Sequence, residues 1–420
     1  MKNKNCFLIA VFFWLFIVNT YSQNKDLIII TGYVYIDNKP IENAAVYLNS
    51  TMVGTTTDDN GAFRMPVKQG RYQLVVSYLG YKNITYNLKT SEYKKPLIFS
   101  LEPETKSLDE IIITSKTGKK SKLSRFKRNQ YFNRFKKTFI GTTLFSKKCK
   151  ILNPEVLKYQ YNQDTKVLSV DASQPLKIKN ESLGYLIDYN LEYFELSPTQ
   201  VAYLGYSKYS NMESQRKKVL KKWQKNRLRS YLGSKQHFLK SLMNKDYRRQ
   251  KYKIELVQKI KNSKRATNEE IIKANNYITE QKMKNVFVDF SKEIEYPSTK
   301  LDSAIIAVKS SNLPLHEYII INKYLKQKEF FNKENEEYYF SFPNELRVRY
   351  MAESEEANYP RNGPKLKYQE NYIRLLANKV KVNKNGTFAN PFKVFVSGYW
   401  SYEQFADELP LDYVPSVKLR

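Results

Sequence analysis

Between residues 27 and 101, apolar and polar residues alternate in short runs. The runs are LIIITGYVYI, AAVYLN, VGTTT, AFRMPV, RYQLVVSYLGY, ITYNLK and PLIFSLE, and polar turns such as DNKP and DDNG separate them. A period of two places alternate side chains on opposite faces of a strand, and Gly, Asn, Asp and Pro mark the turns. About seven short strands in about 75 residues predict a seven-stranded β-sandwich, which we place at residues 24–103.

One turn in this segment could carry chemistry. Asp58, Asp59, Asn60 and Gly61 lie between two predicted strands. They could form a tight hairpin turn, a calcium loop or a catalytic acid pair. Asn-Gly supplies the positive φ angles of a hairpin, and Asp side chains cap such turns. The spacing of an EF-hand loop is absent, so we interpret the four residues as a structural turn.

From Gly141 onward the pattern again favours strands. GYLIDYNLEYF alternates cleanly and predicts a strand with one buried face, formed by Tyr185, Ile187, Tyr189, Leu191 and Tyr193. KVKVNKNGTF carries Asn385-Gly386 as a second hairpin turn, and NVFVDF at 285–290 is a further candidate strand. We therefore expect a larger, antiparallel β-rich domain at residues 141–416.

Two segments read as helical. A basic segment follows the sandwich, and its apolar stripe consists of Leu123, Phe126, Phe132, Phe135 and Phe139. We assign residues 104–140 to a linker and this basic amphipathic helix, capped by Ser121 or Ser124. It could pack its aromatic side chains on the next domain, lie on anionic lipid or bind nucleic acid.

The second helical segment is an insert at about residues 211–275. It is rich in Lys and Arg, and Gly233 and Ser234 break it in two. His237 lies in its second helix, where we expect a packed or hydrogen-bonding histidine rather than a general base. The predicted fold class is therefore mainly β with a helical insert (α+β).

The N-terminus predicts export. Lys2 and Lys4 precede an apolar run from Cys6 to Val18, and the small residue Ser22 follows. This order is typical of a secretory signal peptide, here residues 1–22. After cleavage of the predicted signal peptide, Cys149 is the only cysteine that remains, so an intramolecular disulfide is not expected.

Composition agrees with a folded chain whose charge is strongly basic. Of 420 residues, 34 are Tyr and 23 are Phe, and 71 Lys and Arg outnumber 41 Asp and Glu, for a formal charge of +30. Such a balance often indicates nucleic-acid binding. Predicted export argues against that partner and favours anionic headgroups, lipopolysaccharide phosphates or acidic glycans.

Motifs for catalysis or metal binding are not found in the sequence. A zinc peptidase site needs a His-x-x-Glu pair and a distant His. The chain has two histidines; Lys240 stands three residues after His237, and Glu317 directly follows His316. G-x-S-x-G and phosphate-loop motifs are also missing. We assign no catalytic residue, no cofactor and no metal.

The order of the N-terminal motifs resembles a known domain. GYVYIDNKPIENAAVYL, VGTTTDDNGAFRM and GRYQLVVSYLGY are similar to the carboxypeptidase regulatory-like domain of Bacteroidota proteins. The resemblance implies a transthyretin-like sandwich that acts as an accessory module. In SusC-type TonB-dependent receptors a segment like LDEVVVT follows this domain. Here LDEIIIT follows it, and its residues are Leu108, Asp109, Glu110, Ile111, Ile112, Ile113 and Thr114.

The remainder of the chain is too short for such a receptor. About 300 residues follow LDEIIIT, fewer than a plug and a barrel of about 22 strands require. Blocks such as RSYLGSKQHFLKSL and GYWSYEQFADELPLDYVP resemble the C-terminal region of Bacteroidota proteins with the same first domain. That resemblance implies architecture and envelope location but no activity.

Three functions are compatible with these patterns. The first is a non-enzymatic binding or scaffold protein of the cell envelope, in the periplasm or associated with the outer membrane. Its partner would be an envelope protein, a glycan or an anionic lipid surface, and nucleic acid is not expected. The second is a small outer-membrane β-barrel or receptor-related protein with a periplasmic sandwich. The third is a hydrolase of envelope polymers.

Overall fold

The computed structural model describes residues 27–104, 113–114, 124–361 and 364–415. The chain divides into two compact units. The first comprises Met1–Leu228 and Glu408–Ser416, and the second comprises Arg229–Asp407 and Val417–Arg420. The predicted signal peptide, residues 1–22, lies outside the described residues. The predicted fold class, mainly β with inserted helices, is confirmed.

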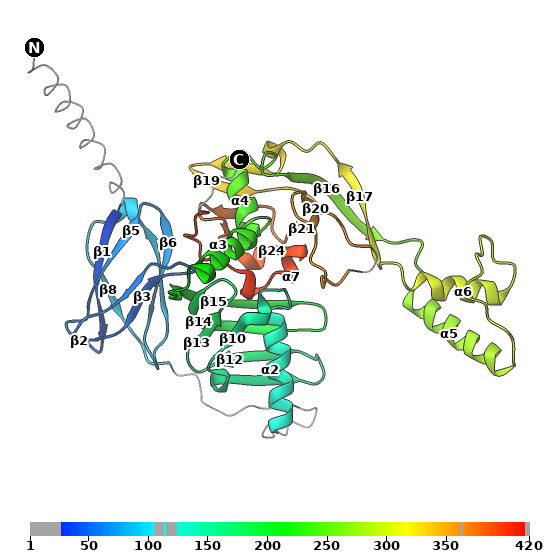
Figure 1. Cartoon of the computed structure of the whole chain (residues 1–420), viewed down its shortest axis with the longest axis horizontal. Helices are drawn as coiled ribbons and strands as arrows, with labels where there is room; N and C mark the ends of the chain where they lie inside the picture. The colour runs from blue at the N-terminus through cyan, green and yellow to red at the C-terminus, as the bar shows by residue number, and fades with distance from the viewer. Residues whose placement is uncertain (1–26, 105–112, 115–123, 362–363, 416–420) are drawn as a thin grey trace, which may run out of the picture. The chain divides into compact units, whose positions relative to one another are not determined.

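The first unit begins with the predicted β-sandwich (Figure 1). One sheet has the order β2-β1-β5, with β8 also paired to β1, and the other has the order β4-β3-β6-β7. The strands are β1 (Leu27–Ile36), β2 (Lys39–Pro40), β3 (Ala45–Leu48), β4 (Gly54–Thr56), β5 (Ala62–Lys68), β6 (Arg71–Ser77), β7 (Ile84–Lys89) and β8 (Leu97–Ser100). The pattern predicts seven of these eight strands and misses β2, which has two residues. β2 pairs with β1 across Asp37 and Asn38, whose φ angles of 48° and 64° form a hairpin turn with two positive φ angles.

Burial explains the alternation in the sandwich. In the longer runs, alternate apolar side chains point inward and form one cluster, which includes Ile30, Val34, Val46, Phe63, Met65, Leu74, Val76 and Leu88. β1 pairs antiparallel with β5 and parallel with β8, so β5 and β8 belong to the same sheet as β1.

A seven-stranded sheet follows the sandwich in the first unit. Its order is β10-β13-β14-β12-β11-β9, and β15 also pairs with β14. The strands are β9 (Ile113–Thr114), β10 (Cys149–Ile151), β11 (Leu157–Asn162), β12 (Leu168–Ala172), β13 (Leu176–Asn180), β14 (Tyr185–Leu196) and β15 (Val201–Asn211). Short 3₁₀ turns in this unit lie at Thr90–Glu92, Ser146–Lys148 and Pro154–Val156.

Helix α2 (Arg125–Phe139) packs its aromatic side chains on this sheet. Ser124 caps it, because the Lys127 backbone N–H donates to the Ser124 hydroxyl at 3.3 Å. The buried residues are Tyr131, Phe135 and Phe139, and the Phe135 ring lies 4.8 Å from that of Phe194. The predicted stripe is therefore partly wrong: Phe126 is 78% exposed, while Tyr131, which the stripe omits, is buried.

A β-bulge changes the predicted face of β14. Leu191 pairs with Gly205 and Tyr193 pairs with Leu204, so Glu192 is an extra residue without a partner in the ladder. An extra residue shifts every later side chain to the other face. Tyr185, Ile187, Tyr189 and Leu191 are buried as predicted, but Tyr193 is 37% exposed and Phe194 is buried in its place.

The second unit contains two antiparallel sheets. The larger has the order β17-β16-β20-β21-β24, and the smaller has the order β18-β19-β22-β23. Their strands are β16 (Tyr252–Lys261), β17 (His316–Asn322), β18 (Phe331–Glu334), β19 (Glu337–Phe340), β20 (Glu345–Tyr350), β21 (Gln369–Leu375), β22 (Val380–Asn383), β23 (Thr387–Phe388) and β24 (Val394–Gly398). β22 and β23 form the hairpin predicted from Asn385-Gly386, and Gly386 has a φ of 86°.

The helices are α3 (Lys217–Tyr231), within which the division between the units falls, and α4 (Lys235–Met243), α5 (Asn268–Met283), α6 (Lys300–Ser310) and α7 (Tyr399–Tyr402) of the second unit. Further 3₁₀ turns lie at Gln327–Glu329, Pro391–Lys393 and Phe405–Asp407. The predicted insert at 211–275 breaks between α3 and α4 at Gly233–Ser234, as expected, but it is not all helical, because β16 intervenes before α5. The pattern also misses α6 and wrongly proposes a strand at 285–290. Among the described residues no helix has the length and apolar character needed to cross a membrane.

Candidate functional site

Hydrogen bonds within the acidic turn, mainly from its backbone N–H groups to the Asp58 side chain, hold it in place. The Asp58 carboxylate accepts from the backbone N–H groups of Asn60 and Ala62 at 3.0 and 2.8 Å, and the Asn60 side-chain amide donates to Asp59 at 2.8 Å. Gly61 has a φ of 68°, and an added Cβ would lie 2.6 Å from the Val34 carbonyl oxygen. These contacts are those of a turn. The expected hairpin is wrong, however, because β4 and β5 belong to different sheets of the sandwich.

The receptor-like segment is described only at its end. Leu108 to Ile112 lie outside the described residues. Ile113 and Thr114 form β9, which pairs parallel with Tyr161 and Asn162 of β11. The segment thus ends as an edge strand of the seven-stranded sheet.

His237 is part of a buried structural network in the second unit. Its side chain is 2% exposed, and its Nδ1 lies 3.2 Å from the Gly233 backbone nitrogen and 3.0 Å from the Tyr252 hydroxyl. Nε2 lies 3.3 Å from the Gln250 side-chain oxygen. Burial lowers the pKa of His237 from 6.5 to about 4, and the hydrogen bond to Gln250 offsets this only in part.

These surroundings leave no room for a substrate at the His237 ring. Cys149 is also buried, in β10. In the described part of the chain, no group of three or more His, Cys, Asp or Glu side chains is placed to hold a metal ion.

The sandwich and the seven-stranded sheet of the first unit are joined by backbone hydrogen bonds. Ser50 donates its N–H to the Ser207 carbonyl at 2.7 Å, and Tyr209 donates its N–H to the Thr51 carbonyl at 3.0 Å. The Asn49 side chain accepts from the Ser207 N–H at 3.0 Å. The segment after β3 is therefore fixed to β15.

Side chains extend this junction along β14. Asn190, which is 8% exposed, donates from Nδ2 to the Tyr47 hydroxyl at 2.8 Å and to the Ser77 hydroxyl at 3.2 Å. Two residues on, the Asn83 amide donates to the Glu192 carboxylate at 2.8 Å. Glu192 is the extra residue of the bulge, so the bulge supplies the side chain that contacts the β6–β7 loop.

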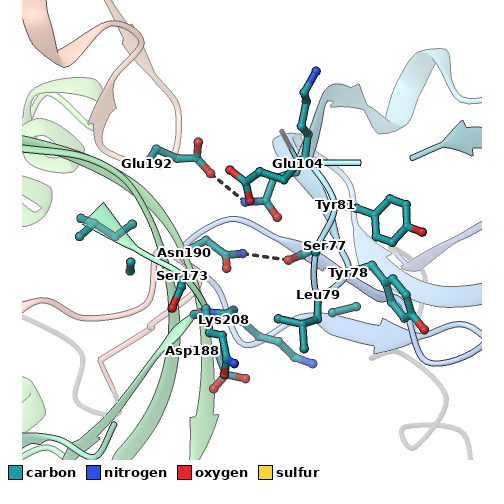
Figure 2. Close-up of a pocket in the computed structure, with 18 of the residues that line it drawn as sticks. Ser77, Tyr78, Leu79, Tyr81, Glu104, Ser173, Asp188, Asn190, Glu192 and Lys208 are labelled. Carbon is teal, nitrogen blue, oxygen red and sulfur yellow. Dashed lines mark hydrogen bonds between the residues drawn. The ribbon is translucent and has the colours of Figure 1, made fainter. Parts of the chain in front are cut away.

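Beside these contacts lies a groove of about 670 Å³ between the sandwich and the sheet (Figure 2). The β6–β7 loop, the β12–β13 loop and β14 line it. Its charged residues are three lysines and three acids, namely Lys82, Lys177, Lys208, Glu104, Asp188 and Glu192. Of the other lining residues, six are Asn, Ser or Gln and nine are Tyr, Leu, Ala, Gly or Pro.

Two of the three aromatic residues at the groove, Tyr78 and Tyr81, do not face it. The rings of Tyr78 and Tyr81 lie 5.8 Å apart and pack against the sandwich core. Figure 2 shows both rings turned away from the cavity, whereas Asn190 points toward Ser77 across it. The groove therefore offers hydrogen-bonding groups rather than stacking surfaces or a strong field of one sign.

Comparison with known proteins agrees with the fold of the sandwich. Residues 30–113 match the family model of the CarboxypepD_reg-like domain. A solved protein of Bacteroides fragilis NCTC 9343, described as a "putative membrane-associated protein of unknown function", is 9% identical. That alignment covers 88% of this chain and 93% of that chain, but its TM-score of 0.15 carries no argument. The comparison with curated proteins found no match.

The sequence pattern identifies the CarboxypepD_reg-like domain but not its groove. The residues that form the junction, such as Tyr47, Asn83 and Asn190, are more than 100 positions apart across it. The sequence contains one local signal for this site. Asn190 and Glu192 lie on the less apolar face of a predicted strand whose other face is rich in Tyr. That signal also fits an ordinary solvated face, so it could not single out a site.

Proposed function

We propose that this chain is a non-enzymatic binding protein of the cell envelope, and that its groove holds a segment of an uncharged glycan. The supporting observation is the groove between the CarboxypepD_reg-like domain and the seven-stranded sheet. It is fixed by the hydrogen bonds of Asn190 and Ser50, so its walls are preorganised.

The chemistry of the lining favours a glycan over the other expected partners. An anionic lipid headgroup would favour a basic site, yet the lysines and acids of the groove are equal in number. An apolar peptide anchor would favour exposed apolar walls, and Leu79, at 63% exposed, is the main such side chain. Carboxylate, amide and hydroxyl groups are donors and acceptors that suit sugar hydroxyls.

Location and lack of catalysis belong to the same proposal. The predicted signal peptide supports an envelope location. The CarboxypepD_reg-like match supports an accessory role, because the resemblance implies a module that accompanies other domains. The buried, hydrogen-bonded state of His237 gives no support to a hydrolase built on that residue.

The test is a substitution that places a large side chain in the groove. Gln174 lines the groove and is exposed, so Gln174→Trp would occupy space without removing the Asn190 or Glu192 contacts. Gln163→Trp is a matched control, because Gln163 is an exposed residue in the β11–β12 turn of the same sheet. We expect neutral oligosaccharides of glucose, mannose or N-acetylglucosamine to bind the wild type in calorimetry.

We expect Gln174→Trp to weaken that binding at least tenfold and Gln163→Trp to leave it unchanged. Equal binding by the two variants would place the glycan elsewhere. No binding by the wild type to a broad panel of neutral glycans, together with binding to anionic vesicles, would contradict the proposal.

A further inference from the structure

Strand β17 is the outer strand of the larger sheet in the second unit. In the described part of the chain it pairs only with β16, from Lys261↔His316 to Leu256↔Asn322. Figure 1 shows the two strands running side by side. In an antiparallel pair, alternate residues direct N–H and C=O groups away from the neighbouring strand. The outer edge of β17 therefore presents backbone groups that another strand could pair with.

The side chains along this edge are apolar and exposed. Ile319, Ile320 and Ile321 are 50%, 45% and 48% exposed. The register shifts here, since Asn322 pairs with Leu256 while Ile320 pairs with Val257, which leaves Ile321 as an extra residue. Three consecutive isoleucines place apolar groups on both faces of the strand.

β17 also lacks most of the usual protections of an edge strand, and the extra residue at Ile321 is the exception. Natural edges carry lysine or proline within the strand, or another element covers them. The seven residues of β17, HEYIIIN, contain neither residue. The opposite edge differs, because all residues of β24 are half-buried and α7 follows directly. Within β17, Tyr318 stacks on Tyr372 at 4.2 Å, which fixes the strand in place.

We propose that β17 pairs antiparallel with β17 of a second copy of this chain, with the two-fold axis at Ile320. The stretch from Glu317 to Lys323, EYIIINK, is self-complementary in this arrangement. Glu317 faces the partner's Lys323, Ile319 faces the partner's Ile321, and Ile320 faces itself. A two-fold interface requires such a self-complementary patch.

Charge and burial select a second copy over an unrelated strand. The pairing brings opposite charges together at both ends, and directly opposed charges of opposite sign stabilise a strand pair. It also covers the three exposed isoleucines, which a bare edge would leave as an aggregation site. The two larger sheets would become one continuous sheet through the axis.

The first experiment measures mass in solution and is independent of glycan binding. We expect the wild type to sediment as a dimer at tens of micromolar. Ile320→Lys places two lysines at the axis and should give a monomer. Ile98→Lys is the control, because Ile98 is 72% exposed on β8 of the sandwich, and it should leave the dimer intact.

A charge reversal tests the register. Glu317→Lys and Lys323→Glu should each weaken the dimer at least tenfold at low salt, and the double variant should restore it. In a Cys6→Ser background, Ile320→Cys should form an intermolecular disulfide on oxidation, since residues facing each other at the axis lie within disulfide range. Leu313→Cys, seven residues from the axis, should not form one.

Four results would overturn the proposal. The first three are a monomeric wild type at tens of micromolar, a dimer that Ile320→Lys leaves intact, and a double reversal that fails to restore the dimer. Indefinite aggregation in place of a dimer would also overturn it, because closed two-fold pairing ends at two copies.

Discussion

At the scale of single residues, His237 shows how burial sets a protonation state. Its ring lies among Tyr231, Tyr252 and Tyr350, with ring centroids 5.0, 5.3 and 5.9 Å away. Burial is the largest influence and lowers its pKa to about 4, while the charge of Asp246 opposes that shift and that of Lys240 adds to it. The imidazole is therefore neutral at pH 7.

This shift predicts a pH dependence of stability. The folded-state pKa is below the ordinary value of 6.5, so the unfolded chain binds the proton more readily. The stabilisation is complete above pH 6.5, is lost as the pH falls from 6.5 to 4, and changes no further below 4. A shift of this size corresponds to about 3 kcal/mol.

We expect His237→Gln to flatten the dependence of unfolding free energy on pH within that window. Trp400 is buried near Phe238 and can report unfolding of the second unit in a background that carries Trp14→Phe and Trp223→Phe. His316→Gln is the control, because His316 is exposed on β17, and it should keep the wild-type slope. The same slope in all three proteins would show that His237 does not titrate on unfolding.

At the scale of elements, substitutions in α2 can test whether its aromatic side chains stabilise the fold by packing on the sheet. Phe135 is fully buried, whereas Phe126 on the same helix is 78% exposed. Phe135→Ala should lower stability by about 3–5 kcal/mol, because it leaves a cavity against Phe139 and Phe194. Phe126→Ala should change it by less than about 0.5 kcal/mol.

Hydrogen exchange of the α2 and β14 amides measures both effects in the first unit without assuming that the whole chain unfolds in one step. If Phe126→Ala were as damaging as Phe135→Ala, the packing we describe for α2 would be wrong. Release of the protein from anionic vesicles by Phe126→Ala would instead support the interfacial-helix alternative.

Elements with strong local signals are predictable from this sequence. The sandwich strands alternate regularly, and Asn385-Gly386 specifies the β22–β23 hairpin. Glu192 marks the limit of this approach, because a bulge adds one residue without any change in composition. The pattern also misses β16, because this strand lies within a basic segment that reads as helical. Its pairing with β17 and β20 favours a strand despite its lysines.

The candidate groove was beyond sequence reasoning for a physical reason. Its walls come from the β6–β7 loop and from β14, and only the folded chain brings Asn83 to Glu192. The same holds for the turn at Asp58, whose residues are evident although the two sheets they connect are not.

At the scale of the first unit, hydrogen bonds from several segments connect the sandwich to the sheet. The C-terminal residues add to the junction, because Leu411 donates its N–H to the Ser50 carbonyl at 2.7 Å. The Met52 N–H lies 3.2 Å from the Asp412 carboxylate. Segments from three parts of the chain therefore meet at the turn after β3, so a deletion of residues 24–114 would remove partners from the remaining sheet.

We predict that Asn190 contributes much of the free energy that couples the sandwich to the sheet. Asn190→Ala should cost about 1–3 kcal/mol, because the Tyr47 and Ser77 hydroxyls lose their buried donor. Tyr47→Phe removes the acceptor on the sandwich side. Because the two residues share one hydrogen bond, the double variant should be less destabilised than the sum of the single variants, by about 0.5–3 kcal/mol.

Exchange of the β3 and β14 amides in the four proteins of the cycle measures that difference on both sides of the junction. A matched cycle of Asn190→Ala with Thr31→Ala, on the other sheet of the sandwich, should be additive. Additive effects in the Tyr47–Asn190 cycle would mean that the sandwich opens independently of the sheet. The groove would then lack a fixed wall, and a preorganised glycan site would lose its physical basis.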